Sequence, residues 1–439
     1  MSASVDNAAS TIKDNLDQGL FDWDVTHDEL TENNRKVAEL SPRERNELIS
    51  KLSDDDLKNW TQEIDGMSGA LTASERDDLF RDLAAGLDGK QVTRLVDAFD
   101  GSPQGREALG NAIAQHASSD AKVAFVNATK DSINGDYSAS DGRDGNAETV
   151  VLSKVLGSLR DDPGRFDSAV KSLSDSQLQA VMTVGLGRQH IVDFSGRTAG
   201  MDIYRSSASL NILDGAAKSS DPEVKGRVFE AATGQFQMLE GGSMDKTFTD
   251  AVTKLVKSDP VTLVDELKSR TDLSGKSLTA YLKEMLGSGN EQDVRNLLVQ
   301  MQQGNDGKGN AYERFADPNL AHNLGFFAGA TAAAINSIAD DAESQGDLLK
   351  NIFGAGFGAA GAANPAAGVI ASVGNGITSI AIDDIINNLN GDSTELKRAI
   401  FELGMPRGPD GKINPGPERD GAPRTNYDAG FAAIAEVNR

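Results

Sequence analysis

Two neighbouring stretches of this chain, residues 40–66 and 71–101, carry the same pattern of apolar and helix-capping residues. Apolar residues recur at intervals of three and four, which gives each predicted helix one buried stripe. Ser41-x-x-Glu44 and Thr72-x-x-Glu75 are capping boxes, in which two side chains satisfy backbone N–H groups at a helix start. Each copy is therefore predicted to be a pair of helices. The matched positions, 31 residues apart in the first helix and 35 apart in the second, are Leu40/Leu71, Ser41/Thr72, Glu44/Glu75, Arg45/Arg76, Leu48/Leu79, Leu52/Leu83, Leu57/Val92, Trp60/Leu95, Ile64/Phe99, Asp65/Asp100 and Gly66/Gly101.

A longer duplication follows, at an offset near 100 residues. Its Asp-Pro and Leu-Ser pairs are helix starts, because proline is tolerated at the first helical position and Asp or Ser caps it. No stretch shows a sustained alternation of β-branched residues, which would indicate a strand. The sequence therefore predicts an all-α protein of stacked helix pairs with an internal duplication. The matched segments are 118–120 with 219–221, 128–129 with 232–233, Lys154 with Lys254, 162–163 with 259–260, and 173–178 with 273–278.

We expect five regions along the chain, separated by polar, Gly-rich or Pro-rich stretches that are typical of loops. In the last region, Phe431, Ile434 and Val437 are predicted to share one side of a short helix. The regions are 1–39 (leader and first helix), 40–104 (two-copy helix-pair region), 105–302 (duplicated helical region, with copies at about 105–188 and 206–302 and a connector at 189–205), 311–403 (apolar helical hairpin domain) and 404–439 (Pro-rich tail with a short terminal helix).

Composition excludes several classes of function. Acidic residues number 67 and basic residues 43, a formal net charge of −24, so the chain lacks the basic surface of a nucleic-acid binder. The absence of cysteine excludes disulfides, thiol catalysis and Cys-based metal centres. Four scattered histidines leave little material for a histidine metal centre, and we predict no metal and no cofactor.

The first 19 residues lack the charged start and the continuous apolar stretch of a signal peptide. Their Ser-, Asn- and Asp-rich composition suits a disordered leader. We therefore expect export without a cleaved signal peptide, by an injection-type machine, or otherwise a location in the bacterial cytoplasm.

Residues 65–75 resemble a calcium-binding EF-hand loop, with Asp65, Thr72 and Glu75 as candidate ligands. The loop is one residue short, and Met67 stands where a second carboxylate should be. Calcium takes about six to eight oxygen ligands, and the capping box explains Thr72 and Glu75 without a metal. A structural turn is the favoured interpretation, and a calcium site is the alternative.

The connector between the two long copies, residues 187–205, groups residue types that serve in acid–base or nucleophilic catalysis. Their order matches no known triad, and a connector between repeats needs polar residues in any case. We therefore predict a non-enzymatic protein, with a hydrolytic site around His190 as the alternative. The grouped residues are His190, Asp193, Ser195, Arg197, Asp202 and Arg205.

Three uncharged stretches follow one another near the C-terminus, at residues 323–339, 351–364 and 366–382. The last two are predicted to form a helical hairpin that turns at Asn364-Pro365. At 1.5 Å per residue its arms span about 21 and 26 Å, which is less than the bilayer core of about 30 Å. Neither arm is an ordinary membrane span, but the two could insert together as a hairpin.

Small residues in this region predict close helix approach. Gly325 and Gly329 are spaced four apart, as are Gly354 and Gly358, and this spacing lets helix backbones touch. Each glycine costs a helix about 1 kcal/mol relative to alanine. Tight packing in a soluble core and insertion into lipid would both offset that cost, so both interpretations stay open.

We predict that the hairpin is the membrane-active element and that acidic residues bracket it. Between residues 317 and 395 there are nine acidic residues and one basic residue, so entry into a membrane requires acid, a partner or an injection machine. The predicted hairpin residues are Phe353, Gly354, Phe357, Gly358, Pro365, Val369, Ile370, Ile377 and Ile380. The predicted acidic flanks are Asp340, Asp341, Asp383 and Asp384.

An uncharged helical hairpin near the C-terminus of a cysteine-free helical protein resembles the pore-forming domains of colicins. That resemblance covers residues 323–389 and implies a hairpin held inside a soluble bundle and released at a membrane. The whole chain is also similar to the harpins of plant-associated bacteria, which are acidic, cysteine-free and glycine-rich. That similarity implies a secreted bacterial effector. Both resemblances rest on composition.

Two functions follow from these patterns. The first is a secreted bacterial effector or toxin whose hairpin perturbs or forms pores in membranes at low pH. The second is a non-enzymatic helical-repeat protein that binds a protein partner, because stacked helix pairs present extended surfaces. The expected partner is a host or target-cell protein, or a secretion chaperone.

Overall fold

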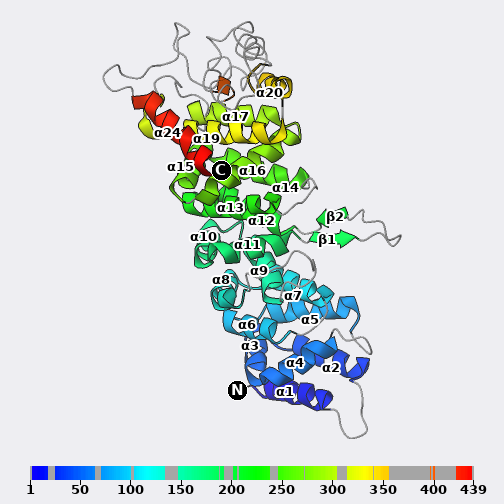
Figure 1. Cartoon of the computed structure of the whole chain (residues 1–439). Coiled ribbons are helices and arrows are strands. Elements are labelled where there is room, and N and C mark those ends of the chain that lie inside the picture. The colour runs from blue at the N-terminus through cyan, green and yellow to red at the C-terminus, as the bar shows by residue number, and fades with distance from the viewer. Residues whose placement is uncertain are drawn as a thin grey trace, which may run out of the picture. The chain divides into compact units, whose positions relative to one another are not determined.

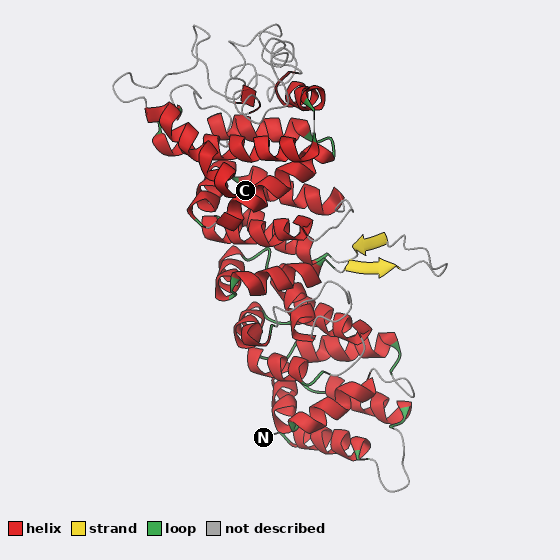
Figure 2. Cartoon of the chain, viewed as in Figure 1, coloured by secondary structure: helices red, strands yellow, loops and turns green. Residues whose placement is uncertain are grey.

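The computed structural model of the chain describes residues 2–17, 25–64, 71–99, 103–133, 147–186, 188–191, 201–204, 207–237, 246–270, 272–303, 314–339, 341–354, 396, 399–400 and 422–437. Within these residues it contains twenty α-helices, a 3-10 turn, a π-helical turn and one two-stranded ribbon (Figure 2). The predicted all-α class is therefore confirmed, apart from the short ribbon.

The chain divides into two compact units, residues 1–224 and 225–439. The helices of the first unit are α1 (Ala3–Leu16), α2 (His27–Ala38), α3 (Pro42–Lys51), α4 (Asp54–Ile64), α5 (Ala73–Ala84), α6 (Gly89–Asp97), α7 (Pro103–His116), α8 (Ser119–Thr129), η1 (Lys130–Ser132), α9 (Ala147–Ser158), α10 (Pro163–Ser172), α11 (Asp175–Gly185) and α12 (Ala208–Lys218). Helix α13 (Pro222–Gln237) crosses the boundary between the units.

The helices of the first unit pack in two rows (Figure 1). In one row α2 contacts α5, α5 contacts α7, α7 contacts α9 and α9 contacts α12. In the other row α3 contacts α6, α6 contacts α8 and α8 contacts α10. Contacts such as α3 with α5 and α8 with α9 join the rows. Each helix thus buries its apolar stripe against neighbours that lie nearby in the sequence.

The predicted capping boxes are confirmed at the starts of α3 and α5. The Ser41 and Thr72 side chains each accept a hydrogen bond from the backbone N–H of the glutamate three residues on, and that glutamate accepts from the capping residue. Proline stands at the start of six of the described helices, where its missing N–H needs no partner. These prolines are Pro42, Pro103, Pro163, Pro222, Pro260 and Pro318.

Long basic side chains tie the C-terminal ends of helices to other helices. The Arg45 guanidinium donates to the carbonyls of Val37 at 3.1 Å and Asp82 at 2.7 Å. Arg94 donates to the carbonyls of Ile49 at 2.7 Å and Leu52 at 3.0 Å, at the end of α3. A helix leaves its last carbonyls without intrahelical donors, so these cations satisfy groups that would otherwise need water.

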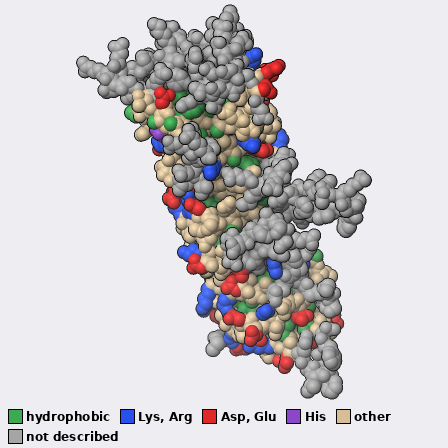
Figure 3. Space-filling model, in the orientation of Figure 1, with side chains coloured by type: hydrophobic (Ala, Val, Ile, Leu, Met, Phe, Trp, Pro, Cys, Tyr) green, Lys and Arg blue, Asp and Glu red, His purple; other side chains and the backbone are tan. Residues whose placement is uncertain are grey.

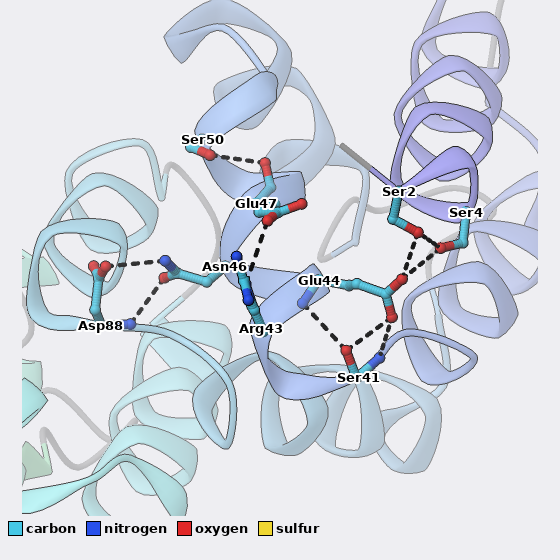
Figure 4. A network of polar contacts seen from close by, with 9 residues as sticks. All are labelled: Ser2, Ser4, Ser41, Arg43, Glu44, Asn46, Glu47, Ser50 and Asp88. Carbon is cyan, nitrogen blue, oxygen red and sulfur yellow. Dashed lines mark hydrogen bonds and ion pairs between the residues drawn. The ribbon is translucent and has the colours of Figure 1, made fainter.

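The N-terminal residues, which composition had suggested as a disordered leader, form helix α1. Val5 and Ile12 are fully buried, and α1 packs against α2, α3 and α4. At its start the Ser2 and Ser4 hydroxyls both donate to Glu44 Oε1 at 2.6 Å (Figure 4). Glu44 is thereby shared between the capping box of α3 and the first turn of α1.

The ribbon lies within the connector and consists of β1 (Arg188–Ile191) and β2 (Met201–Tyr204). The strands are antiparallel, with His190 opposite Asp202 and Ile191 opposite Met201. No strand was predicted here, because four-residue strands are too short to establish a period-two pattern.

The second unit is built around one central helix, α19. Its helices are α14 (Lys246–Ser258), α15 (Pro260–Ser269), α16 (Asp272–Gly287), α17 (Glu291–Gln303), α19 (Pro318–Ile338), α20 (Ala342–Leu349), the π-helical turn η2 (Lys350–Gly354) and α24 (Ala422–Val437). Helices α15, α16, α17, α20 and α24 all contact α19. Fourteen of its 21 residues are buried, including the unbroken run from Asn323 to Ala332, so α19 is covered on every side.

Candidate functional site

The feature of the second unit that best fits the sequence predictions is α19, which contains the first uncharged stretch. It carries no Asp, Glu, Lys or Arg in its 21 residues. A helix that is apolar all round is normally buried in a core or in a membrane. Among the residues that the structure describes, no helix is both long and apolar enough to cross a bilayer.

Glycine lets α19 and α24 touch backbone to backbone. A Cβ atom built on Gly325 would lie 2.0 Å from the carbonyl oxygen of Tyr427, and one on Gly329 would lie 2.9 Å from that of Phe431. From the other helix, a Cβ on Gly430 would lie 2.1 Å from the carbonyl oxygen of His322. Real Cβ atoms do not approach this closely, so no larger residue fits at Gly325 or Gly430 without movement. The close approach predicted from the Gly325 and Gly329 spacing is therefore present.

Three side chains of α24 anchor this contact. Tyr427, Phe431 and Ile434 are at most 5% exposed and follow the spacing of one helix face. Burial raises the pKa of Tyr427 far above its usual value, because the charged phenolate would be desolvated. The sequence had predicted Phe431 and Ile434 on one side of a helix, and both are buried. The side chain of Val437 lies outside the described residues.

The core beside this contact has little free space. A void of about 10 Å³ is lined by residues of α17, α19, η2 and α24, among them Leu324, Phe327, Phe353 and Tyr427. A single water needs roughly this volume. The void is too small for an organic ligand, so the apolar centre is packing rather than a binding cavity.

A polar cleft of about 360 Å³ opens at the N-terminal end of α19. Its lining includes Asp265 from α15, Arg314, Asp317 and Asn323. Asn323 is 2% exposed, and its Nδ2 donates to Asp265 Oδ1 at 3.3 Å. Lys268 Nζ donates to the same Asp265 oxygen at 2.8 Å. The cleft therefore combines carboxylates with a guanidinium at the edge of the apolar centre.

The charges around this cleft shift the titration of two groups. The hydrogen bond from Lys268 is the main cause that holds the pKa of Asp265 below its usual value. Burial lowers the pKa of His322, and the nearby Lys268 charge lowers it further. His322 is therefore neutral at neutral pH, which leaves α19 without any charge.

Most of the predicted hairpin lies outside the described residues. Phe353 is in η2, is 2% exposed and packs against the core, next to the buried Ile352. Gly354 ends η2. The predicted residues outside the described ranges are Phe357, Gly358, Pro365, Val369, Ile370, Ile377 and Ile380.

One of the predicted acidic flanks has a local structural role. Asp341 caps α20, because its carboxylate accepts from the Ser344 backbone N–H at 2.8 Å and from the Ser344 hydroxyl at 3.1 Å. These hydrogen bonds lower the pKa of Asp341. Asp340, Asp383 and Asp384 lie outside the described residues.

At Thr72 and Glu75, the two candidate calcium ligands that can be placed, the structure shows the predicted helix-capping contacts. Glu75 Oε2 accepts from the Thr72 backbone N–H at 2.9 Å and from the Thr72 hydroxyl at 2.6 Å, and it lies 3.1 Å from His27 Nε2. Asp65 lies outside the described residues. Across the described part of the chain, no three His, Asp or Glu side chains gather as metal ligands would.

In the connector, the ribbon brings two of the six grouped residues into register. His190 lies opposite Asp202 across the antiparallel pair. Asp193, Ser195, Arg197 and Arg205 lie outside the described residues. The pairing gives a histidine and a carboxylate on adjacent strands and does not by itself assemble a nucleophile with its base.

Two features of the second unit had no clear signal in the sequence. Gly325 and Gly329 meet the backbone of Tyr427 and Phe431, about 100 residues away, and only the predicted shared side of Phe431 and Ile434 indicated a buried face there. The polar cleft joins Asp265 to Asn323, which are also far apart in the sequence.

Comparison of this chain with known protein families, with curated proteins and with solved structures gave no match.

Proposed function

We propose that this chain is a non-enzymatic helical interaction protein that binds a protein partner. The observation that carries the proposal is the continuity of helix contacts in the first unit, where each helix of a row contacts the next. Proteins built in this way present extended surfaces made from many helices, and they use those surfaces to bind other proteins.

In this proposal, the binding surface is built from repeated pairs of helices. The pair α3 and α4 corresponds to α5 and α6, and their capping boxes are equivalent. Each capping glutamate also receives a contact from the start of an earlier helix. For Glu44 this comes from Ser2 and Ser4, and for Glu75 it comes from His27. The shared arrangement supports descent of the two pairs from one unit.

The longer duplication is part of the same proposal. Asp162 and Asp259 both cap a helix that begins with proline. Earlier in each proposed copy, a buried threonine donates to the carbonyl of a fully buried phenylalanine four residues before it. These pairs are Thr129 with Phe125 and Thr233 with Phe229. The matched local structures support a second round of repetition.

The charge of the first unit indicates the kind of partner. Residues 1–100 contain 23 acidic and 11 basic residues, which is half of the net charge of the chain. On the face in Figure 3, acidic and basic side chains are interspersed over the described N-terminal helices. An acidic excess favours a partner with a basic surface, which charge attraction would also steer into place. Such a partner would be a host or target-cell protein, or a secretion chaperone.

Capture of the partner at two salt concentrations tests the proposal. The full chain should retain one protein in stoichiometric amount at about 50 mM salt, and should lose most of it at about 500 mM, where charges are screened within a few ångströms. Neutralising two exposed acids of the first unit, in D28N/D55N, should weaken retention several-fold. The matched control E343Q/D347N changes two exposed acids of the second unit and should not. The proposal would be contradicted if retention of the partner were the same at both salt concentrations and in D28N/D55N.

A second candidate is a secreted effector whose C-terminal unit perturbs membranes, and α19 is the observation that favours it. An uncharged 21-residue helix is about 31 Å long, which is close to the thickness of the bilayer core, about 30 Å. In this candidate α19 and the predicted hairpin stay covered at neutral pH and are released by acid. Export without a cleaved signal peptide belongs to the same candidate.

Asp341 adds a condition to membrane entry at low pH in this candidate. Because hydrogen bonds from Ser344 lower its pKa, Asp341 stays ionised at pH 4–5 while α20 is folded. Membrane entry then requires either that Asp341 remains outside the bilayer or that the first turn of α20 unravels. Dye release from anionic liposomes should be stronger at pH 4.5 than at pH 7, and D341N should raise the pH at which release begins. Absence of release at both pH values would eliminate the candidate.

A further inference from the structure

The polar cleft at the N-terminal end of α19 is lined by one face of each of two helices. In both helices the lining residues stand at positions i, i+1 and i+4, which lie on the same side of a helix. The described residues that line the cleft all belong to the second unit. The helical lining residues are Val261, Thr262 and Asp265 from α15, and Asn319, Leu320 and Asn323 from α19.

The charged groups of the cleft keep positions open for a ligand. Asp317 Oδ1 caps the first turn of α19, and Asp265 Oδ1 accepts from Lys268 Nζ at 2.8 Å. That hydrogen bond holds the pKa of Asp265 below its usual value, so this carboxylate is ionised at neutral pH. Among the described residues, the second oxygen of each carboxylate has no donor, and Arg314 has no carboxylate within ion-pair distance. One guanidinium and two carboxylates are therefore available.

A buried amide in the lining lacks a hydrogen-bond donor. Asn323 is 2% exposed, and its Nδ2 donates to Asp265 Oδ1 at 3.3 Å. Its Oδ1 is buried and has no partner among the described residues. Leaving a buried amide oxygen without a donor is costly to a folded protein. Because Asn323 lines the cleft, an N–H group of a ligand can supply that donor.

The volume and the charges of the cleft together indicate the class of ligand. Its volume of about 360 Å³ falls in the range of small-molecule sites, about 300–1,000 Å³. Carboxylates outnumber the guanidinium by two to one, so a complementary ligand carries two cations and one carboxylate. We infer that the cleft binds a free cationic amino acid, whose carboxylate pairs with Arg314 and whose cations pair with Asp265 and Asp317. One of its N–H groups donates to Asn323 Oδ1. This site is independent of the protein partner proposed for the first unit.

Calorimetric titration of the full chain with L-arginine and with agmatine tests the site. Agmatine has the same cations but no carboxylate, so it should bind at least about tenfold more weakly than L-arginine. R314M should weaken binding of L-arginine by at least about tenfold and leave binding of agmatine unchanged. The matched control K283M removes an exposed cation of α16 that does not line the cleft, and it should alter neither.

A second variant tests the anionic side of the cleft. D317N keeps a helix-capping side chain at the start of α19, because asparagine also caps helices, but it removes the negative charge. It should weaken binding of both L-arginine and agmatine several-fold. The matched control D250N neutralises an exposed acid of α14 and should weaken neither.

Four results would overturn the inference. The first is no binding of L-arginine up to about 1 mM, and the second is an equal loss of L-arginine and agmatine binding in R314M. The third is native affinity in D317N. The fourth is equal affinity for L-arginine and for N-acetyl-L-arginine amide, whose blocked ends imitate an arginine inside a protein. That result would assign the cleft to a side chain of a protein instead of a free amino acid.

Discussion

The first unit and the centre of the second unit solve the problem of burying helices in different ways. Helices such as α3 and α5 bury one stripe and expose charged side chains, including Arg43, Glu47 and Asp77. Helix α19 has no charged residue and is surrounded by five other elements. The first arrangement extends by adding helices to a row, whereas the second forms one closed centre.

The difference shows where each part of the molecule can act. A row of half-exposed helices keeps its polar faces available, so binding there needs no conformational change. The apolar surface of α19 is available only after a covering helix has moved. The partner binding that we propose for the first unit therefore requires no change in the second unit.

The largest expected effect comes from placing a charge in the centre. Ala330 is fully buried in α19, so Ala330→Asp introduces a carboxylate with no partner and should cost the second unit more than about 4 kcal/mol. The matched change Ala73→Asp, at the exposed first residue of α5, should alter stability by less than about 0.5 kcal/mol. Urea unfolding followed by circular dichroism measures both. Equal tolerance at the two positions would show that α19 is not surrounded.

These two regions also differ in how much of them could be predicted. Helices α3 and α5 follow from local signals, because a capping serine or threonine and its glutamate are three residues apart. The contact of α24 with α19 could not be predicted, because Gly325 meets the Tyr427 carbonyl across about 100 residues and nothing in either segment specifies the other. The ribbon at His190 was missed because its strands have four residues each.

The glycine contact predicts an effect of opposite sign in the two units. Gly325→Ala would put a Cβ 2.0 Å from the Tyr427 carbonyl, so overpacking should outweigh the better helix propensity and cost about 1–3 kcal/mol. A Cβ atom added to Gly164, in α10 of the first unit, would meet no other atom within 4 Å. Gly164→Ala should therefore stabilise by about 0.5–1 kcal/mol. Thermal unfolding distinguishes the cases, and stabilisation by both changes would refute the close contact of α19 with α24.

The cations that hydrogen-bond to helix ends in the first unit predict a loss of similar size. Arg94→Met removes two hydrogen bonds to carbonyls of α3 and an ion pair with Asp54, which should cost about 1–3 kcal/mol. Arg81→Met removes ion pairs that a half-exposed guanidinium makes within its own helix, with Asp78 and Asp82, and should cost less than about 0.5 kcal/mol. Chemical denaturation of the two variants compares them directly. Similar losses would mean that Arg94 acts as an ordinary surface charge.

The smallest expected effect is a shift in the pKa of one carboxyl group, Glu44, in the first unit. The uncharged α19 has no comparable titrating group. Hydrogen bonds from Ser2 and Ser4, and then from Ser41, lower the pKa of Glu44 from 4.5 to about 2. A carboxylate with a lowered pKa stabilises the folded state above its unfolded pKa, and this contribution is lost as the pH falls through about 2. Nuclear magnetic resonance should thus give a midpoint for Glu44 near pH 2. S2A/S4A should move it towards 4.5, though not all the way, because the Ser41 hydrogen bonds remain.

Helix α19 has no carboxylate, so the packing of its own side chains has no corresponding transition. If S2A/S4A leaves the Glu44 midpoint unchanged, Ser2 and Ser4 do not connect α1 to the capping box of α3. The contrast between the titrating periphery and the uncharged α19 would then be lost.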